Sequence, residues 1–304
     1  MRAVQITGFG GPEVLVIGEV PIPAPAADEV LVRVAAVGIN PVDWKVREGY
    51  AKEFIPFHFP TTIGGEFAGT ITALGEGVTD FAVGDEVHGM TGMIGAFAEY
   101  AVVKITQIAL KPSRLSFVEA AAVPAAAFTA VTTLNAGKVG AGTRILIHSA
   151  AGGVGSMAVQ LAHLRGAEVT ALASPANIEF VKSLGATHVV DRTTAYEDQI
   201  GDFDVVLDAY GPEAQARSWQ LLRRGGALLS LVAPPDQAQA TAFGVRAEMV
   251  IGQTERSGLE EVDRLIADGS VRLKISRTYA FADIGQALIE SQAGKVQGKL
   301  IATV

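Results

Sequence analysis

The sequence predicts an α/β protein with a β-rich first part and a doubly wound parallel sheet in its second part. The 304 residues are 49% hydrophobic and 18% charged, which is enough apolar material for two cores and excludes a disordered chain. Up to about residue 110, short runs of Val, Ile and Ala are broken by Gly and Pro. From about residue 116, strand and helix patterns alternate with short loops.

The first part is expected to hold short strands that end at turn residues. We expect strands at 30–37, 66–74, 85–88 and 97–103, with turns at 75–77 and 83–85. Pro21, Pro23 and Pro25 predict a stiff connector before the first of these strands, because proline has a fixed φ.

The second part is expected to alternate parallel strands with helices. The strands are expected at 143–148, 168–173, 187–190, 203–207 and 227–232, and the helices at 154–165, 177–184 and 214–222. Gly185 is expected to end the second helix and Gly225-Gly226 the third. Residues 259–304 predict two helices, 259–268 and 282–290, and a strand, 299–304. This segment is too small for a domain of its own and should pack onto another part of the chain.

Composition excludes several classes of function. The net charge of −8 and the lack of a Lys/Arg-rich run argue against a DNA-binding protein. The absence of cysteine excludes disulfides, thiolate nucleophiles, iron–sulfur clusters and cysteine-ligated zinc. Residues 120–131 are the longest apolar stretch and contain Pro124, so no run is expected to reach the ~18–20 residues of a membrane span. We therefore expect a cytoplasmic protein without a membrane partner.

The glycine-rich segment 149–155, Ser-Ala-Ala-Gly-Gly-Val-Gly, stands between the first buried strand and its helix. Such a turn exposes backbone N–H groups at the positive end of the helix, where a pyrophosphate can bind. Ala151, Gly152, Gly153 and Val154 are therefore expected to bind a dinucleotide, the alternative being a tight turn without a ligand.

The end of the second strand indicates which nicotinamide cofactor is preferred. NAD sites usually place Asp or Glu there, about 20 residues after the turn, to bind the ribose 2′-hydroxyl. This chain has Ser174 instead, and Ser174 and Asn177 can hydrogen-bond a 2′-phosphate while Arg192 pairs with it. We therefore expect NADPH rather than NADH. A solvated surface arginine is the other interpretation of Arg192.

Several ordered blocks resemble the medium-chain dehydrogenase/reductase superfamily, in its zinc-free quinone oxidoreductase (zeta-crystallin-like) branch. The blocks are Gly-Ile-Asn-Pro-Val-Asp-Trp-Lys at 38–45, Gly-Gly-Glu-Phe-Ala-Gly at 64–69, Gly-Asp-Glu-Val at 84–87, Gly-Ala-Phe-Ala-Glu-Tyr at 95–100, 120–124 with Thr129-Ala130, the glycine-rich segment and Gly298-Lys299. The resemblance implies a GroES-like catalytic domain, 1–115 with 248–304, and an inserted Rossmann domain, 116–247. It also implies that the cofactor lies in the cleft between them.

The resemblance also locates the positions of the catalytic zinc ligands. Zinc-dependent alcohol dehydrogenases of this superfamily carry cysteine where Asn40 stands and Gly-His-Glu where Gly64-Gly65-Glu66 stands. The four-cysteine lobe of their structural zinc is missing too. The five histidines lack ligand-like spacing and are expected to be packing or surface residues: His58, His88, His148, His163 and His188. No metal is therefore expected.

Without a metal, the resemblance implies hydride transfer from NADPH to a quinone or an α,β-unsaturated ketone, which is already electrophilic. Thr129 and the turn at Leu231 and Val232 are implied to contact the nicotinamide end. Asn40 is implied to donate to the substrate oxygen or fix the nicotinamide, the alternative being a helix cap before Pro41. Tyr50 is the candidate proton donor, with solvent as the alternative, since some relatives carry a tyrosine at the position of Lys45.

Two other functions stay open at this stage. One is an NADPH-binding protein with little catalysis, such as a redox sensor or a structural or RNA-binding protein. The other is a 2-enoyl-thioester reductase, for which no basic or pantetheine-binding groove is evident. A homodimer is expected through the glycine- and apolar-rich edge at 243–253.

Overall fold

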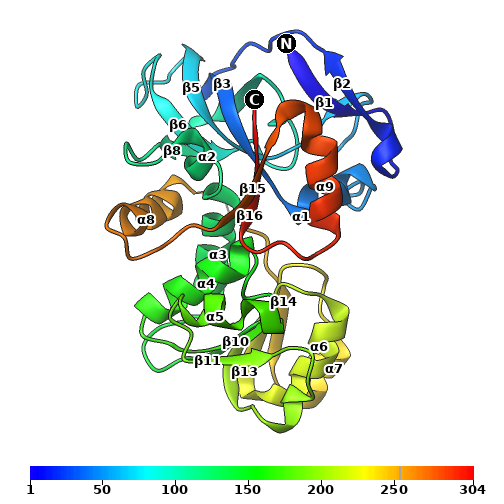
Figure 1. The fold of residues 1–304 in the computed structure, drawn as a ribbon, viewed down its shortest axis with the longest axis vertical. Helices are drawn as coiled ribbons and strands as arrows, with labels where there is room; N and C mark the ends of the chain where they lie inside the picture. Colours follow the sequence, from blue (N-terminus) through cyan, green and yellow to red (C-terminus); the bar gives the residue numbers. More distant parts are fainter. Residues whose placement is uncertain (253–254) are drawn as a thin grey trace. The chain divides into compact units, whose positions relative to one another are not determined.

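The computed structural model describes residues 1–252 and 255–304. The chain divides into two compact units, 1–125 with 254–304 and 126–253 (Figure 1). The expected boundary at 115/116 lies just before a helix that packs in the first unit, and the one at 247/248 lies inside a strand of the second.

The first unit contains two sheets. The larger has the strand order β15 (Ile275–Ala280), β16 (Lys299–Thr303), β3 (Glu29–Ile39), β5 (Glu66–Leu74), β6 (Glu86–Met90), β8 (Ile108–Leu110), with β7 (Tyr100–Lys104) also pairing with β3. The smaller has the order β2 (Leu15–Glu19), β1 (Arg2–Ile6), β4 (Thr61–Thr62). The four strands predicted in this part correspond to β3, β5, β6 and β7. Their alternating Val, Ile and Phe side chains supply most of the apolar core of this unit.

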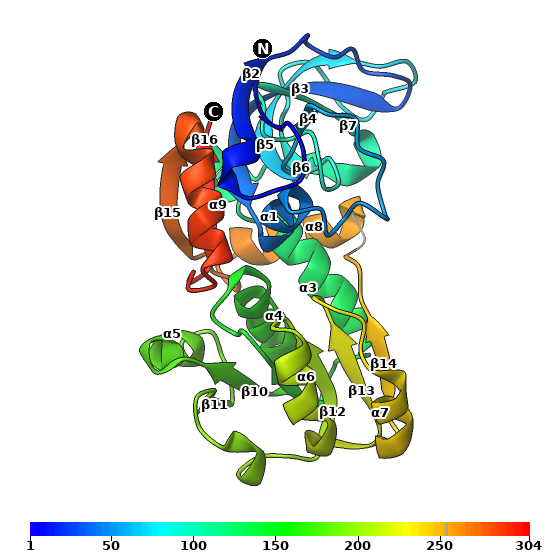
Figure 2. The same cartoon turned by 90° about the vertical axis from the view of Figure 1, so that its right-hand side faces the viewer.

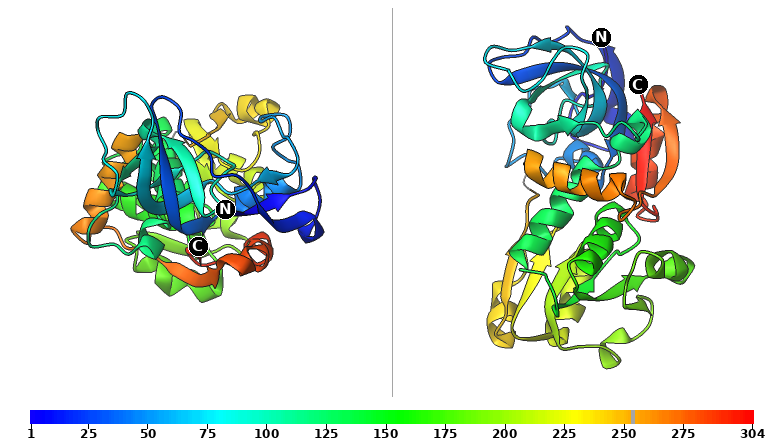
Figure 3. Two further views of the ribbon diagram at one scale, coloured as in Figure 1. Left: turned by 90° about the horizontal axis from the view of Figure 1, so that it is seen from above. Right: turned by 90° about the vertical axis from the view of Figure 1, so that its left-hand side faces the viewer.

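Short helices surround these sheets. In the described residues they are η1 (Pro12–Val14), α1 (Pro41–Arg47), η2 (Ile105–Gln107), α2 (Phe117–Ala120), α8 (Arg256–Ala267), η6 (Phe281–Asp283) and α9 (Ile284–Gln292). The C-terminal segment completes this unit, as predicted. β16 pairs antiparallel with β3 and α9 packs against α1, so the C-terminal segment lies against residues 29–47 (Figures 1 and 3).

The second unit is a parallel sheet in the order β11 (His188–Asp191), β10 (Glu168–Ala173), β9 (Arg144–Ile147), β12 (Phe203–Asp208), β13 (Leu222–Ser230), β14 (Arg246–Met249). Its helices are α3 (Pro124–Ala136), which begins at the end of the first unit, α4 (Gly153–Leu164), η3 (Pro175–Asn177), α5 (Ile178–Lys182), η4 (Tyr196–Asp198), α6 (Pro212–Ser218), η5 (Trp219–Leu221) and α7 (Gln237–Phe243) (Figure 2). The sheet runs outward from β9 in both directions, which confirms the predicted doubly wound arrangement.

Two predictions in this unit were wrong. The third helix ends at Ser218, and Gly225 and Gly226 lie inside β13 rather than capping a helix. Gly225 has φ +80°, and a Cβ on Gly226 would lie 3.0 Å from the Asp204 carbonyl oxygen, so glycine serves a strand irregularity here. The sequence patterns also did not predict β14, which pairs parallel to β13.

The expectation that no stretch reaches the length of a membrane span was also wrong. By length and composition alone, residues 117–136 are long and apolar enough to cross a membrane. In the structure this stretch forms α2 and α3 with a break at 121–123, and most of it is buried inside the protein. A core helix built from small apolar residues passes the same composition test.

Candidate active site

The glycine-rich turn connects β9 to α4. Ser149 has φ +51° and reverses the chain, and Gly152 precedes the helix in an extended conformation. A Cβ on Gly155 would lie 2.2 Å from the Ser149 carbonyl oxygen, so only glycine lets the first turn of the helix pack on the strand end.

This turn fits a pyrophosphate. The Ser156 N–H donates to the Gly152 carbonyl oxygen at 2.9 Å, so the backbone N–H groups of Gly153, Val154 and Gly155 precede the first intrahelical bond. A Cβ on Gly152 would have one neighbouring atom within 4 Å, the Ser149 carbonyl oxygen at 3.4 Å. The positive end of a twelve-residue helix therefore faces a space that a side chain would fill.

Ser174 and Asn177 contact each other after the carboxyl end of β10, and Arg192 follows the neighbouring strand β11. Asn177 Nδ2 lies 3.1 Å from Ser174 Oγ, and the Arg192 N–H donates to the Ala173 carbonyl oxygen at 2.9 Å. The exposed Arg192 side chain reaches the Tyr210 hydroxyl at 3.3 Å and lies over its ring at 5.4 Å. Sequence reasoning missed Tyr210, because it follows a strand end without a motif of its own.

Arg217 supports the loop that begins with Arg192. Its guanidinium donates to the carbonyl oxygens of Arg192 and Thr194, pairs with Glu197 and lies 3.9 Å from the centre of the Tyr196 ring. The hydrogen bonds from Arg217 hold the pKa of Glu197 below its usual value and raise the pKa of Arg217 itself.

Two buried polar groups lie at the ends of β9 and β12. The Asp208 carboxylate accepts from the N–H groups of Tyr210 and Gly211 and from the side chains of Gln215 and Ser230. His148 Nε2 lies 2.9 Å from Ser218 Oγ, and burial lowers the pKa of this imidazole to about 4. His148 is therefore neutral at pH 7 and adds no charge beside the glycine-rich turn.

The residues implied for the nicotinamide end lie at two places in the second unit. Leu231 and Val232 follow β13, and the Leu231 N–H donates to the Asp208 carbonyl oxygen at 2.9 Å. Thr129 lies on α3, where a Cβ on Gly252 would come 2.9 Å from its hydroxyl oxygen. Glycine at 252 therefore lets the backbone pass close to Thr129.

The first unit holds a buried polar cluster at Asn40. Asn40 Nδ2 donates to Glu66 Oε2 at 2.9 Å, and Lys299 Nζ donates to Glu66 Oε2 at 2.5 Å and to Asn40 Oδ1 at 2.6 Å. Glu66 is fully buried and Lys299 is 6% exposed. Sequence reasoning quoted Glu66 and Lys299 only as family blocks, although a lysine at the start of an otherwise apolar strand is a signal.

Asn40 is the N-cap residue of α1, with an extended backbone, and it forms a capping box with Asp43. Asp43 is the third residue of the helix, and its carboxylate accepts from the Asn40 backbone N–H at 2.7 Å. Asp43 is fully buried, and burial raises its pKa to about 7 against the lowering effects of the Asn40 N–H and Lys299. Tyr50 follows α1 with 67% of its surface exposed, its ring edge-on to Trp44 at 6.2 Å.

The histidines do not gather. His88 is buried between the Ala120 carbonyl oxygen and the Asp263 carboxylate, at 3.0 Å from each, whereas His58, His163 and His188 are exposed. Within residues 1–252 and 255–304, no three His, Cys, Asp or Glu side chains are grouped so that they could hold a metal.

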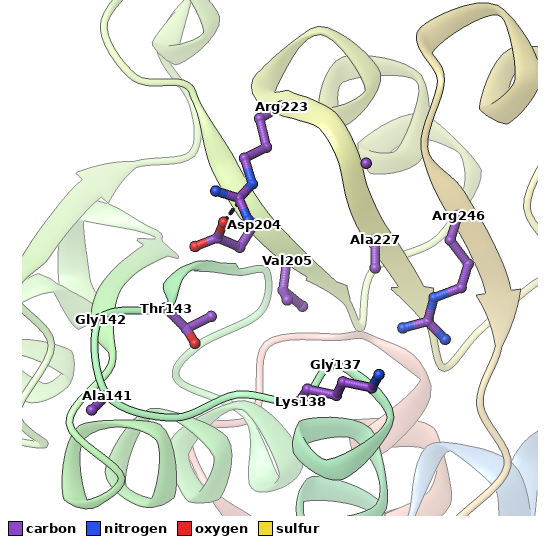
Figure 4. Close-up of a pocket in the computed structure, with 11 residues that line it drawn as sticks. Gly137, Lys138, Ala141, Gly142, Thr143, Asp204, Val205, Arg223, Ala227 and Arg246 are labelled. Atoms are coloured by element: carbon purple, nitrogen blue, oxygen red, sulfur yellow. Dashed lines mark ion pairs between the residues drawn. The ribbon is translucent and has the colours of Figure 1, made fainter.

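A cavity of about 630 Å³ lies at the amino ends of β12, β13 and β14, the edge of the sheet opposite the glycine-rich turn (Figure 4). Arg223 and Arg246 line it, but Arg223 pairs with Asp204 at 2.6 Å and Arg246 with Glu248 at 2.6 Å. Its charges are thus largely compensated, and it has no part in the site above.

Comparisons with known proteins identify the family. Residues 26–113 match the alcohol dehydrogenase GroES-like domain, and residues 184–301 match the zinc-binding dehydrogenase family. The chain is 31% identical to the chloroplastic quinone-oxidoreductase QR1 of Triphysaria versicolor, across 99% of this chain and 98% of that one. It is 36% identical to the chloroplastic NADPH-dependent alkenal/one oxidoreductase of Arabidopsis thaliana, across 77% of this chain and 64% of that one.

The chain superposes on the structure of Escherichia coli quinone oxidoreductase complexed with NADPH with a TM-score of 0.92 and 26% sequence identity. The superposition covers 100% of both chains. The predicted combination of a GroES-like domain and a Rossmann domain is thereby confirmed. The chain belongs to the medium-chain dehydrogenase/reductase superfamily, among its quinone oxidoreductases.

Proposed function

We propose that this protein is a zinc-independent oxidoreductase that transfers a hydride from NADPH to quinones or α,β-unsaturated carbonyl compounds. The observation that carries the proposal is that Ser174 and Asn177 are hydrogen-bonded at the end of β10 and that the Arg192 backbone is bonded to Ala173 beside them. A hydroxyl, an amide and a guanidinium match a 2′-phosphate, whereas the carboxylate that would favour NADH is missing from the end of β10. The names of two relatives, a quinone-oxidoreductase and an NADPH-dependent alkenal/one oxidoreductase, support the same class of reaction.

Each part of the second unit has a role in this proposal. Ala151, Gly152, Gly153 and Val154 bind the pyrophosphate with backbone N–H groups, and Ser174, Asn177 and Arg192 bind the 2′-phosphate. Thr129, Leu231 and Val232 contact the nicotinamide end, as the resemblance implies. NADPH supplies the hydride when bound.

Asn40 and Tyr50 are the proposed catalytic residues. As hydride reaches the substrate, negative charge develops on its oxygen, and an N–H of Asn40 stabilises that charge. The oxygen then takes a proton from Tyr50 or from water. Zinc independence rests on the residues at the ligand positions: Asn40 and Gly65 replace cysteine and histidine, and the Lys299 ammonium lies on Glu66.

Steady-state assays with NADPH and a panel of 1,4-quinones, enones, 2-enoyl thioesters and simple alcohols test the proposal, with and without a chelator. We expect chelator-insensitive turnover of quinones or enones. Oxidation of simple alcohols without quinone or enone turnover would overturn it. NADPH binding without any turnover would favour an NADPH-binding protein with little catalysis. A preference for enoyl thioesters would favour a 2-enoyl-thioester reductase.

We further propose a cytoplasmic homodimer that acts on small molecules and binds neither DNA nor a membrane, with domain limits near 1–115, 116–247 and 248–304. The dimer is proposed to form along the edge at 243–253, of which residue 253 lies outside the described residues. β14 ends the sheet there, and Phe243, Met249 and Ile251 are exposed. Fractionation of cells that carry a tagged full-length chain tests the location.

A further inference from the structure

The Asn40 carboxamide has two charged neighbours of opposite sign. Its oxygen faces the Lys299 ammonium at 2.6 Å, and its nitrogen faces the Glu66 carboxylate at 2.9 Å. An ammonium only donates hydrogen bonds and an ionised carboxylate only accepts them. A flipped amide would set its N–H groups against the ammonium and its oxygen against the carboxylate, so the two neighbours permit one orientation.

The neighbours are themselves held in place. Glu66 Oε1 accepts the Ala125 N–H in the first turn of α3 at 2.8 Å, so both carboxylate oxygens are engaged. A Cβ on Gly38 would come 2.1 Å from Glu66 Oε2, and glycine there leaves the room that the carboxylate occupies. Gly38 pairs with Glu66 across β3 and β5, and Ile39 pairs with Leu300 across β3 and β16. Backbone register therefore brings the three side chains together.

One N–H of the carboxamide remains after these contacts. The nitrogen carries two hydrogens, and Glu66 accepts one of them. A cation on the amide oxygen draws electron density from the nitrogen and makes the second N–H a stronger donor. Because Glu66 and Lys299 are buried, water screens the two charges that polarise the amide only weakly.

We propose that Lys299 is a positioning residue that, together with Glu66, aims and strengthens the free N–H of Asn40 toward the oxygen on which negative charge develops. This inference rests on the reductase function proposed above. It assigns to Lys299 a role in the reaction through Asn40, without contact between Lys299 and the substrate.

The first test separates positioning from charge compensation. Lys299→Met alone leaves the buried Glu66 carboxylate unpaired and is expected to lower the melting temperature. The double variant Lys299→Met/Glu66→Gln removes both charges, and its single glutamine oxygen can accept from either Asn40 or Ala125, which contact separate oxygens of Glu66 in the wild type. We expect the double variant to regain most of the melting temperature, with kcat for the quinone about tenfold or more below wild type and KM for NADPH unchanged. Recovery of kcat together with stability would overturn the positioning role. Lys104→Met, an exposed lysine of the same unit, is the matched control.

The second test does not depend on turnover. The side-chain ¹H–¹⁵N signals of Asn40 are assigned by their loss in Asn40→Ala. We expect them to exchange slowly with solvent in the wild type and at least tenfold faster in the double variant, because the amide is then free to flip. Unchanged exchange would overturn the inference. If the wild type reduces neither quinones nor enones, the proposed function fails, while the exchange measurement still tests whether Lys299 orients Asn40.

Discussion

At the scale of single residues, Arg192 shows how neighbours change the interpretation of an exposed cation. By sequence it was either a 2′-phosphate ligand or a solvated surface arginine. In the structure its backbone is bonded to Ala173, its side chain reaches Tyr210, and Arg217 supports its carbonyl oxygen. An arginine whose side chain is held against Tyr210 loses less rotamer entropy on binding an anion than a free one would.

Arg192→Ala should raise KM for NADPH well above tenfold and leave KM for NADH nearly unchanged. The physical reason is that the guanidinium can pair with a 2′-phosphate, which NADH lacks. Steady-state kinetics with both cofactors measure the effect, and Arg224→Ala, at the opposite edge of the same sheet, is the control. Equal changes for the two cofactors would remove the proposed role.

Asp43 predicts a pH dependence of stability. Its pKa is about 7 in the folded protein and 3.8 in the unfolded chain, so the fold keeps a proton that the unfolded chain has lost between these values. Folding is therefore favoured most below about pH 4 by this group, and its contribution falls as the pH rises toward 7. One pKa unit corresponds to about 1.4 kcal/mol.

Asp43→Asn should flatten this dependence, because the amide oxygen can still accept from the Asn40 N–H and cannot ionise. Chemical denaturation at pH 5 and pH 8 measures the change in unfolding free energy between the two values. Asp28→Asn, an exposed position with φ +60° that asparagine tolerates, should keep the wild-type slope. An unchanged slope in Asp43→Asn would show that Asp43 is ionised in the folded protein.

At the scale of elements, two glycines of the turn between β9 and α4 have different tasks. Gly155 lies where a Cβ would meet the Ser149 carbonyl oxygen at 2.2 Å and Ala150 Cα at 2.8 Å, both backbone atoms. Gly152 faces open space and has an extended backbone with φ −76° that alanine adopts freely. Gly155 is therefore needed for the packing of α4 on the end of β9, and Gly152 keeps open the space in front of the helix.

Gly155→Ala should destabilise the protein by about 1–3 kcal/mol, because the helix must move away from the strand end. Gly152→Ala should keep the wild-type melting temperature and weaken NADPH binding, because its methyl group occupies the space before the free N–H groups. Calorimetry and NADPH fluorescence titration separate the two effects. Full NADPH affinity in Gly152→Ala would argue against a pyrophosphate at this turn.

At the scale of the whole molecule, β14 is an edge strand that pairs only with β13 among the strands of residues 1–252 and 255–304. Apolar side chains next to an open strand edge favour pairing with a second chain, because such pairing forms backbone hydrogen bonds and buries the apolar surface at the same time. The sequence predicted this segment as an interface from its composition, without identifying it as a strand.

Light scattering should give twice the 31.6 kDa of one chain. Met249→Lys, at a position that is 42% exposed, should shift the distribution toward the monomer, because a charge would be buried at the interface. Leu164→Lys, which is 47% exposed at the end of α4, should leave the mass unchanged. A monomeric wild type at micromolar concentration would contradict the proposed dimer.

The sequence alone determined the two-part architecture, because local patterns carry it. Continuous apolar runs mark β9 and β10, a glycine-rich turn joins β9 to α4, and both strands lie within a few residues of their predicted bounds. It also located the candidate 2′-phosphate ligands, since residues that follow neighbouring parallel strands meet at one sheet edge. It misjudged Gly225-Gly226, because a glycine pair serves a helix end or a strand irregularity equally well.

Only the tertiary structure decided which groups surround Asn40. Lys299 is 259 residues away in sequence and reaches Asn40 through the pairing of β16 with β3. Which groups contact the Asn40 carboxamide likewise depended on strand pairing, because Glu66 reaches it from β5 and Lys299 from β16. Such choices depend on contacts between distant segments, and local propensity and spacing contain no information about them.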